Sequence, residues 1–270
     1  MKRAAAAAKI NLALLVGPRR ADGLHEVVTI YQRIALADRI TIARSPQLRV
    51  DGFADDTIVR RALELVGDRN GASFAAQIEK RIPVAAGLGG GSSDAATALR
   101  LANELRDDPH PSNVLRAHAR ELGADVPFFL ADGPQLGSGD GSELRPIELP
   151  QDYWILLVMP HDSHKRSTKE VYEAFDARNG ERGFEDRRDV LLGLVDSLRR
   201  PRDLGALPPN DLASSPIGDE LRRLGAFRAD VTGAGPAVYG LFLHGAQARE
   251  ARKLLSPFGR TWVTAPAWYR

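Results

Sequence analysis

The sequence predicts a mixed α+β fold, and three observations lead to this prediction. Predicted strands and helices follow one another through the second half of the chain in the order strand, helix, strand. A glycine-rich run at residues 83–96 connects a predicted strand directly to a helical pattern. The 270 residues are 43% hydrophobic and 27% charged, which is ordinary for a globular protein large enough for one big domain or two lobes.

Apolar runs and apolar spacing predict the elements of the first half. Runs rich in β-branched residues predict strands over residues 10–16, 27–42, 48–50 and 74–82, the second of them split into two strands near residues 37–38. Helical spacing predicts helices over residues 56–66, 94–105 and 113–122, with a short apolar segment at residues 128–130. Ser92 or Ser93 is expected to cap the second helix, with Asp94 in its first turn, where a carboxylate is favoured.

The second half continues with a buried strand over residues 154–159, which Pro160 ends. Glycine, proline and polar residues predict loops at residues 180–188 and 199–209. A helix, two strands, a second helix and a last strand are then predicted over residues 217–224, 229–232, 237–243, 246–255 and 261–265.

Composition excludes several classes of function. The net charge is only +2, from 37 basic and 35 acidic residues, and no basic block carries interleaved aromatics, so we expect no nucleic-acid partner. The chain has no cysteine, which excludes disulfides, thiolate metal sites and a cysteine nucleophile. No stretch approaches the roughly 20 apolar residues of a membrane span. We therefore expect a soluble, cytoplasmic protein without a membrane partner.

The glycine-rich run is typical of a phosphate-binding loop. Four of the five residues 87–91 are glycine, so backbone N–H groups can converge on an anion, and the helix that follows adds its dipole. No Gly-Lys-Ser/Thr sequence closes the run, which excludes a Walker A loop. Ser92 stands where the third glycine of a dinucleotide fingerprint would fall, so that reading is also disfavoured.

Three motifs resemble those of the GHMP kinases, small-molecule kinases named for galactose, homoserine, mevalonate and phosphomevalonate. Residues 83–96 are similar to the family's Pro-x-x-x-Gly-Leu-Gly-Ser/Gly-Ser-Ser-Ala/Asp-Ala motif. Residues 8–12 resemble its first motif, and residues 231–237 resemble its third, which lies near the nucleotide phosphates. The resemblance implies a two-lobed architecture with a cleft between a ribosomal-S5-like N-terminal lobe, residues 1–150, and an α/β-sandwich C-terminal lobe, residues 151–270.

Within the GHMP kinases the resemblance narrows to the 4-diphosphocytidyl-2-C-methyl-D-erythritol kinases. It is carried by residues 9–12, 20–25, 87–96 and 122–129, and it spans residues 8–240. It implies ATP-dependent phosphorylation of the 2-hydroxyl of a cytidine-diphosphate sugar alcohol, in the non-mevalonate route to isoprenoid precursors. Magnesium is expected from phosphoryl-transfer chemistry, although the sequence assigns no ligand to it. The sequence also leaves the oligomeric state open.

The resemblance also implies roles for individual residues. Lys9 and Asp125 are the expected catalytic pair, in which Asp125 accepts the proton of the attacking hydroxyl or orients it, and Lys9 is its cationic partner. Asn11 shares a strand face with Lys9 because side chains alternate along a strand. The expected ATP-phosphate contacts are Pro83, Val84, Ala85, Ala86, Gly87, Leu88, Gly89, Gly90, Gly91, Ser92 and Ser93. The expected substrate contacts are Asn11, His25, Tyr172, Thr232 and Gly233.

Two residues depart from the family pattern, and three other functions stay open. Leu24 stands where these kinases usually carry a tyrosine beside the cytosine-binding His25, and Ala234 stands where a serine is common. The alternatives are a homoserine- or mevalonate-type kinase, a nucleotide-binding relative without catalysis, and an RNA-binding protein of S5-like topology. Taken without the resemblance, Asp125 can be a turn or helix cap, Lys9 a solvated charge, and Tyr172 a packing residue.

Overall fold

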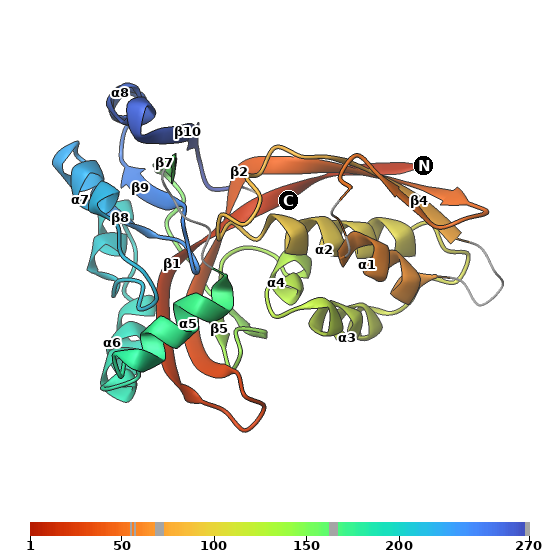
Figure 1. Ribbon diagram of the computed structural model, residues 1–270, viewed down its shortest axis with the longest axis horizontal. Helices are drawn as coiled ribbons and strands as arrows, with labels where there is room; N and C mark the ends of the chain where they lie inside the picture. The colour runs from red at the N-terminus through yellow and green to blue at the C-terminus, as the bar shows by residue number, and fades with distance from the viewer. Residues whose placement is uncertain (55, 57, 68–72, 162–166, 268–270) are drawn as a thin grey trace. The chain divides into compact units, whose positions relative to one another are not determined.

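The computed structural model describes residues 1–54, 56, 58–67, 73–161 and 167–267, which form two compact units (Figure 1). Unit 1 consists of Met1–Ala8, Leu36–Val84 and Gly89–Asp132, and unit 2 of Lys9–Ala35, Ala85–Leu88 and Gly133–Arg270. These units do not coincide with the expected lobes, residues 1–150 and 151–270. Two long strands, β1 (Lys2–Arg19) and β2 (His25–Ser45), contribute to both units.

The predicted break near residues 37–38 is wrong, because β2 is one uninterrupted strand. Asp38 is only 1% exposed, yet its carboxylate is well supplied with donors. It accepts hydrogen bonds from the backbone N–H groups of Arg81, at 2.5 Å, and Ile82, at 2.8 Å, and from Lys80 Nζ at 2.5 Å. A buried carboxylate with three donors does not interrupt the strand.

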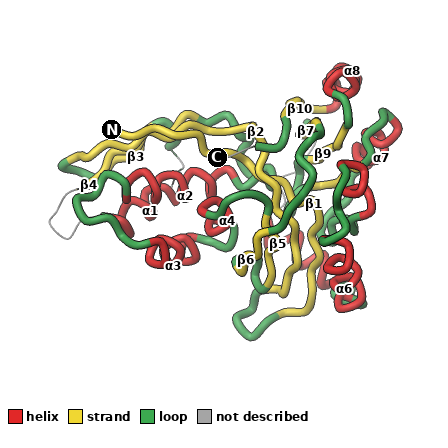
Figure 2. The backbone as a smooth tube through the Cα atoms, turned by 180° about the vertical axis from the view of Figure 1, so that it is seen from behind, coloured by secondary structure: helices red, strands yellow, loops and turns green. Residues whose placement is uncertain are grey.

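Unit 1 is a sheet covered by helices. Its strands β3 (Arg49–Asp51) and β4 (Ser73–Glu79) join the second half of β2 in the order β3-β4-β2, and β1 also pairs with β2. The β2–β4 pairing is antiparallel and the β3–β4 pairing is parallel. The helices are α1 (Ile58–Val66), α2 (Gly90–Asn103), α3 (Ser112–Leu122) and α4 (Val126–Leu130). Figures 1 and 2 both show α1 and α2 beneath this part of the sheet.

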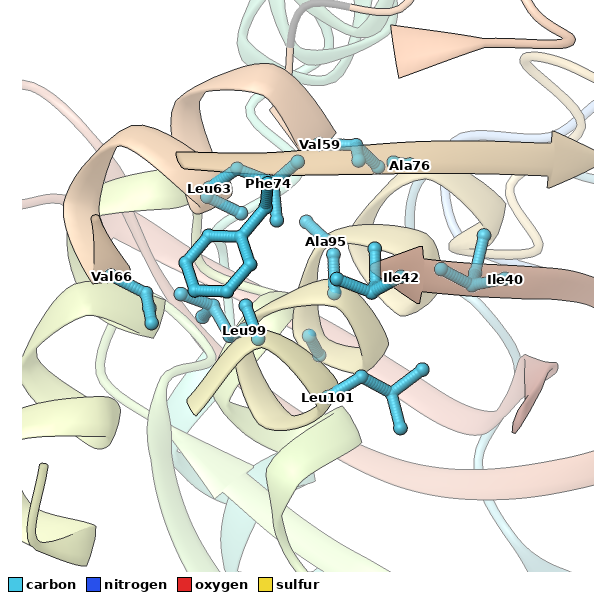
Figure 3. Packing of buried hydrophobic residues seen from close by; sticks show 14 of the residues in the cluster. Ile40, Ile42, Val59, Leu63, Val66, Phe74, Ala76, Ala95, Leu99 and Leu101 are labelled. Atoms are coloured by element: carbon cyan, nitrogen blue, oxygen red, sulfur yellow. The ribbon is translucent and has the colours of Figure 1, made fainter. Parts of the chain in front are cut away.

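The core of unit 1 forms around α2. Ala95, Ala98 and Ala102 are fully buried, and such small side chains let α2 approach α1 and the sheet closely. Larger residues from the sheet and the helices, such as Phe74 and Leu99, fill the space between them (Figure 3). Each of these large side chains contributes roughly 2–3 kcal/mol by leaving water. The packing of α2 therefore fixes the place of Gly90, its first residue.

The predicted cap of α2 is wrong. The helix begins at Gly90, its N-cap residue is Gly89, and no side chain caps it. Ser92 and Ser93 consequently lie inside the helix rather than before it, and Asp94 lies beyond its first turn. Gly89 has a φ of 67°, a left-handed conformation that glycine adopts without strain, so the chain turns into the helix earlier than the hydroxyl residues suggest.

Unit 2 contains β5 (Gln135–Ser138) and β6 (Glu143–Pro146), which extend the first half of β2, and a separate four-stranded antiparallel sheet. This second sheet has the order β10-β7-β9-β8, with β7 (Trp154–Pro160), β8 (Arg228–Val231), β9 (Val238–Phe242) and β10 (Gly259–Thr264). The helices of the unit are α5 (Thr168–Ala177), α6 (Phe184–Val195), α7 (Pro216–Arg223) and α8 (Gly245–Leu255), with short 3-10 turns at Pro201–Ala206 and Ser256–Phe258.

Most predicted elements of the second half are confirmed within a few residues, and two predicted loops are not. The segment 180–188 contains the start of α6, and residues 199–209 contain a 3-10 turn. Phe184 opens α6 and is buried, so tertiary packing decides a helix that its polar sequence does not suggest. Within the described residues, no helix is both long enough and apolar enough to cross a membrane.

Candidate active site

Lys9 and Asn11 lie side by side on β1 in unit 2, as the alternation of strand side chains predicts. Lys9 Nζ donates a 2.7 Å hydrogen bond to Asn11 Oδ1, and the two residues are 3% and 4% exposed. The ammonium also lies 5.6 Å from the centre of the Tyr31 ring. A cation this deeply buried is costly without partners, so it is held at a defined place rather than solvated.

Asn11 connects the first motif to the third motif. Its backbone N–H donates to Thr232 Oγ1 at 3.1 Å, and its Nδ2 donates to Thr29 Oγ1 at 2.8 Å. The Thr232 hydroxyl lies 3.3 Å from Asn11 Oδ1 and 3.2 Å from the carbonyl oxygen of Gly87. Gly233 follows with a φ of 57°, and the Cβ of an alanine there would lie 3.4 Å from Gly87 Cα. Three motifs distant in sequence therefore meet in one cluster of unit 2.

The glycine-rich run turns sharply before α2. Ala85, Gly87 and Gly89 all have positive φ angles, of 54°, 77° and 67°. A Cβ on Gly87 would lie 2.2 Å from the carbonyl oxygen of Thr232, so only glycine fits there. The carbonyl of Ala86 accepts from Ala237 N–H at 3.2 Å, and that of Leu88 accepts from Lys9 N–H at 2.9 Å.

These carbonyl contacts orient the N–H groups of the loop. The C=O and N–H of a trans peptide point in opposite directions. Since the carbonyls of Ala86 and Gly87 point to Ala237 and Thr232, the N–H groups of Gly87 and Leu88 point away from them. Such outward N–H groups in a left-handed turn are the geometry that binds anions.

The remainder of the run belongs to unit 1. Pro83 and Val84 precede the turn, and Gly90, Gly91 and Ser92 form the first turn of α2. Ser92 is half-buried, while Ser93 is 1% exposed and its N–H donates to the Gly89 carbonyl at 2.9 Å. The helix N-terminus contributes partial positive charge at this end of the run.

Asp125 immediately precedes α4 in unit 1 and is half-buried. It occupies the N-cap position, but its carboxylate makes no capping hydrogen bond. The helix-capping hydrogen bond that the sequence allows for Asp125 is therefore not formed. Lys9 belongs to unit 2 and Asp125 to unit 1, and their joint action stays a prediction.

His25 and Tyr172, the predicted cytosine contacts, lie together in unit 2. Their ring centres are 4.9 Å apart with planes tilted by 31°. His25 is 7% exposed, and its Nε2 lies 2.7 Å from Asp176 Oδ1. Arg19 donates to the other carboxylate oxygen of Asp176, at 2.6 Å and 3.1 Å, and these bonds lower the pKa of Asp176, with His25 adding to the effect. Asp176 thus fixes the imidazole beside Tyr172.

A cavity of about 550 Å³ opens in unit 2 beside the third motif. Its walls come from α5, from residues 212–217 and from the loop that holds Ala234. A space of this size is typical of small-molecule sites, and Tyr172 directly follows the cavity-lining Val171 on α5.

Sequence reasoning missed several polar residues that hold this region. Thr29 and Asn210 contact the motifs from distant positions: Asn210 Nδ2 donates to the carbonyls of Val231, at 3.0 Å, and Gly233, at 2.7 Å. In unit 1, Lys80 Nζ bridges Asp38 and Asp94, at 2.5 Å and 2.8 Å, next to the start of α2. Neither network has a local sequence pattern, because the partners are 14 to 42 residues apart.

Comparisons with known proteins agree with this geometry. Residues 57–133 match the family model of the GHMP kinases N terminal domain. Over 95% of its length the chain is 36% identical to 4-diphosphocytidyl-2-C-methyl-D-erythritol kinase of Prosthecochloris aestuarii, covering 94% of that protein. It is 37% identical to the enzyme of the same name from Moorella thermoacetica, over 95% of each chain.

Solved structures give the same result. A 4-(cytidine 5'-diphospho)-2C-methyl-D-erythritol kinase superposes with a TM-score of 0.79 at 30% identity, covering 98% of this chain and all of the other. A mevalonate kinase of Methanococcus jannaschii superposes with a TM-score of 0.75 at 15% identity, covering 98% of each chain, which shows a shared fold alone. The predicted GHMP kinase fold is confirmed, and the chain belongs to the 4-diphosphocytidyl-2-C-methyl-D-erythritol kinase family.

Proposed function

We propose that the protein transfers the γ-phosphoryl group of ATP to the 2-hydroxyl of 4-diphosphocytidyl-2-C-methyl-D-erythritol, in the non-mevalonate route to isoprenoid precursors. The observation that carries the proposal is the cluster of Lys9, Asn11, Gly87 and Thr232, in which three kinase motifs meet, within a chain similar over nearly its whole length to kinases of this name. The substrate is therefore a small molecule, and the acceptor is an alcohol.

The reaction is an in-line displacement without a phosphoenzyme. The oxygen of the 2-hydroxyl forms a bond to the γ-phosphorus, the bond from that phosphorus to the bridging oxygen breaks, and ADP leaves. The N–H groups of Gly87 and Leu88, with the first turn of α2, are suited to holding the nucleotide phosphates. Holding both reactants in line supplies most of the catalysis in this chemistry.

Lys9 and Asp125 are assigned to the reacting hydroxyl. Asp125 accepts the proton that the hydroxyl loses, or orients the hydroxyl for attack, and a half-buried carboxylate is suited to either role. Lys9 supplies a fixed positive charge beside the forming ester, held by Asn11 at 2.7 Å. The assignment requires both groups to act on the same hydroxyl.

The cytidine end of the substrate is assigned to His25 and Tyr172. A tyrosine ring offers a flat surface for stacking a base, and the Asp176 contact keeps the His25 ring in one orientation. Leu24, 52% exposed, adds only apolar contact where relatives usually carry tyrosine.

Magnesium is expected to accompany ATP. Within the described residues, no group of three or more His, Asp or Glu is placed to hold a metal. Mg²⁺ commonly binds through nucleotide phosphates with only one or two protein ligands, so a ready-made cage is not required. When bound, it would neutralise charge on the phosphates. The half-buried Ser92 hydroxyl in the first turn of α2 is the group best suited to assist it.

ADP release from a panel of alcohols tests the substrate. We expect turnover with the cytidine substrate and none with homoserine or mevalonate, and the reverse result would replace this proposal with another GHMP kinase activity. Asp125→Asn should lower kcat at least 100-fold, whereas Asp189→Asn, an exposed aspartate on α6, should not change it. If Asp125→Asn turns over normally, the assigned role of Asp125 is wrong. The double variant Lys9→Ala/Asp125→Asn should lose no more than the more damaging single variant if both act on one hydroxyl.

A further inference from the structure

Thr29 lies on β2 in unit 2, next to the Lys9–Asn11 pair, and is fully buried. Its hydroxyl makes two hydrogen bonds of 2.8 Å, one from Asn11 Nδ2 and one to the carbonyl oxygen of Ala13. A hydroxyl has a single proton, and a carbonyl can only accept. The proton therefore points to Ala13, and the Thr29 oxygen can only accept from Asn11.

This constraint fixes the orientation of the Asn11 amide. Nδ2 has to face Thr29, so Oδ1 faces the Lys9 ammonium, which is itself only a donor. Rotating the amide by half a turn would place Oδ1 against the Thr29 oxygen with no proton between them. It would also place the Asn11 NH₂ group against the ammonium of Lys9, so two favourable contacts would become repulsive.

Thr232 completes the arrangement from the third motif. Its hydroxyl accepts from the Asn11 backbone N–H at 3.1 Å, so the backbone of Asn11 is held as well as its side chain. Asn11 thus has its main chain fixed by Thr232 and its side chain fixed by Thr29. The Lys9 ammonium therefore has an acceptor, Asn11 Oδ1, at a fixed position 2.7 Å away.

We propose that Thr29 is a positioning residue for phosphoryl transfer, acting through Asn11 to hold the Lys9 ammonium in place. The inference deepens the proposed function, on which it rests for the role of Lys9. Catalytic groups in phosphoryl transfer act mainly through placement, so the loss of one support for Lys9 is expected to act on kcat.

Two substitutions separate the hydroxyl of Thr29 from its shape. Thr29→Val has the same shape without the hydroxyl, and Thr29→Ser keeps the hydroxyl. We expect Thr29→Val to lower kcat roughly 10- to 100-fold, with the KM for ATP changed less than about twofold, and Thr29→Ser to recover most of the rate. Thr264→Val, which removes another buried hydroxyl at the end of β10, should leave kcat unchanged. The proposal is overturned if Thr29→Val keeps the wild-type kcat, or if Thr29→Ser loses as much as Thr29→Val.

A spectroscopic measurement tests the hydrogen bond from Asn11 to Thr29 without any measurement of activity. In protein labelled with ¹⁵N-asparagine, the Asn11 side-chain amide, assigned by its loss in Asn11→Asp, should give two slowly exchanging proton signals. Those signals should persist in Thr29→Ser and shift or exchange rapidly in Thr29→Val. Unchanged signals in Thr29→Val would show that Asn11 does not donate to Thr29. If the wild type shows no turnover with the cytidine substrate, the proposed function fails. The NMR signals of the Asn11 amide would still show whether Asn11 donates to Thr29.

A cycle with Asn11 excludes a general loss of stability. In an Asn11→Ala background the amide that Thr29 orients is absent, so adding Thr29→Val should change kcat less than about twofold. A further loss as large as in the wild-type background would mean that Thr29 does not act through Asn11.

Discussion

The Lys80 ammonium donates to Asp94 Oδ2 at 2.8 Å and to Asp38 Oδ2 at 2.5 Å, so one half-buried cation faces two buried carboxylates. The two acids are not equivalent. Asp38 also accepts from two backbone N–H groups, whereas within the described part of the chain Asp94 Oδ1 has no hydrogen-bond partner. Burial raises the pKa of Asp94 to about 7, with Asp38 adding to the increase and Lys80 opposing it. In the folded protein Asp94 is therefore half protonated near pH 7 and mostly protonated below it.

Asp94→Asn should flatten the dependence of stability on pH. The pKa of Asp94 is higher in the folded protein than its ordinary value of 3.8, so the folded state binds the proton more tightly between pH 4 and pH 7. Stability from this group is present at low pH and is lost as pH rises to about 7. From pH 5 to pH 8 the wild type should lose about 2–3 kcal/mol more free energy of unfolding than Asp94→Asn, measured by urea unfolding at both pH values.

Asp107→Asn is the control for this measurement. Its hydrogen bond from Arg44 lowers the pKa of the exposed Asp107, so its contribution is lost only at acid pH and is constant from pH 5 to pH 8. This variant should follow the wild-type slope. An Asp94→Asn protein with that same slope would mean that Asp94 is already ionised at pH 5.

Gly87→Ala should disrupt the phosphate-binding turn. The new Cβ would lie 2.2 Å from the Thr232 carbonyl oxygen at a φ of 77°, so the turn and the third motif have to separate. The expected loss of stability is about 2–4 kcal/mol, from the left-handed conformation and the overpacking together. The KM for ATP should rise at least 10-fold, since the N–H groups of Gly87 and Leu88 would no longer converge.

Gly133→Ala measures the conformational part of that cost alone. Gly133 also has a positive φ, of 65°, but nothing lies within 4 Å of its new Cβ. We expect a loss of about 1 kcal/mol and an unchanged KM for ATP. If Gly87→Ala behaves like Gly133→Ala in both measurements, close contact with Thr232 does not shape the turn.

Local sequence signals predict most of the strands and helices and the shared strand face of Lys9 and Asn11, because each depends on periodicity within one element. The errors have a common physical cause in tertiary contacts. Asp38 stays inside β2 because Arg81 and Ile82 supply its donors from 43 and 44 residues away. The supports of the site, such as the bond from Asn11 to Thr29, likewise join residues that no local pattern connects. Motif resemblance identifies residues that are expected to contact the substrate. The hydrogen bonds that position these residues are seen only in the fold.

Leu24→Tyr should tighten binding of the cytidine group. Leu24 is 52% exposed next to His25, so a larger ring can be accommodated without displacing packed atoms. A stacked tyrosine should contribute about 1 kcal/mol more than leucine, which is roughly a fivefold lower Kd for cytidine diphosphate by calorimetry. Leu254→Tyr, at an exposed leucine on α8, should leave that Kd unchanged. An unaltered Kd in Leu24→Tyr would place the base elsewhere.

Asn210→Asp should weaken ATP binding through the third motif. Asn210 is 8% exposed and uses every polar atom of its side chain: Nδ2 donates to the carbonyls of Val231 and Gly233, and Oδ1 accepts from Leu212 N–H at 2.8 Å. Aspartate has nearly the same shape but no N–H, so two carbonyls would face a carboxylate. We expect about 2–4 kcal/mol lower stability in urea unfolding and a severalfold higher KM for ATP, because Thr232 and Gly233 lose their support.

Asn103→Asp distinguishes that effect from a general loss of stability. Asn103, in α2 of unit 1, is 7% exposed and likewise donates to one backbone carbonyl and accepts from one backbone N–H, both of His110. The same substitution there should lower stability without raising the KM for ATP, because His110 lies outside the three motifs. Equal KM values in the two variants, compared at a temperature where both are folded, would show that Asn210 has no special role in the third motif. A higher KM in Asn210→Asp alone would make the side chain that holds the Gly233 carbonyl a determinant of nucleotide binding.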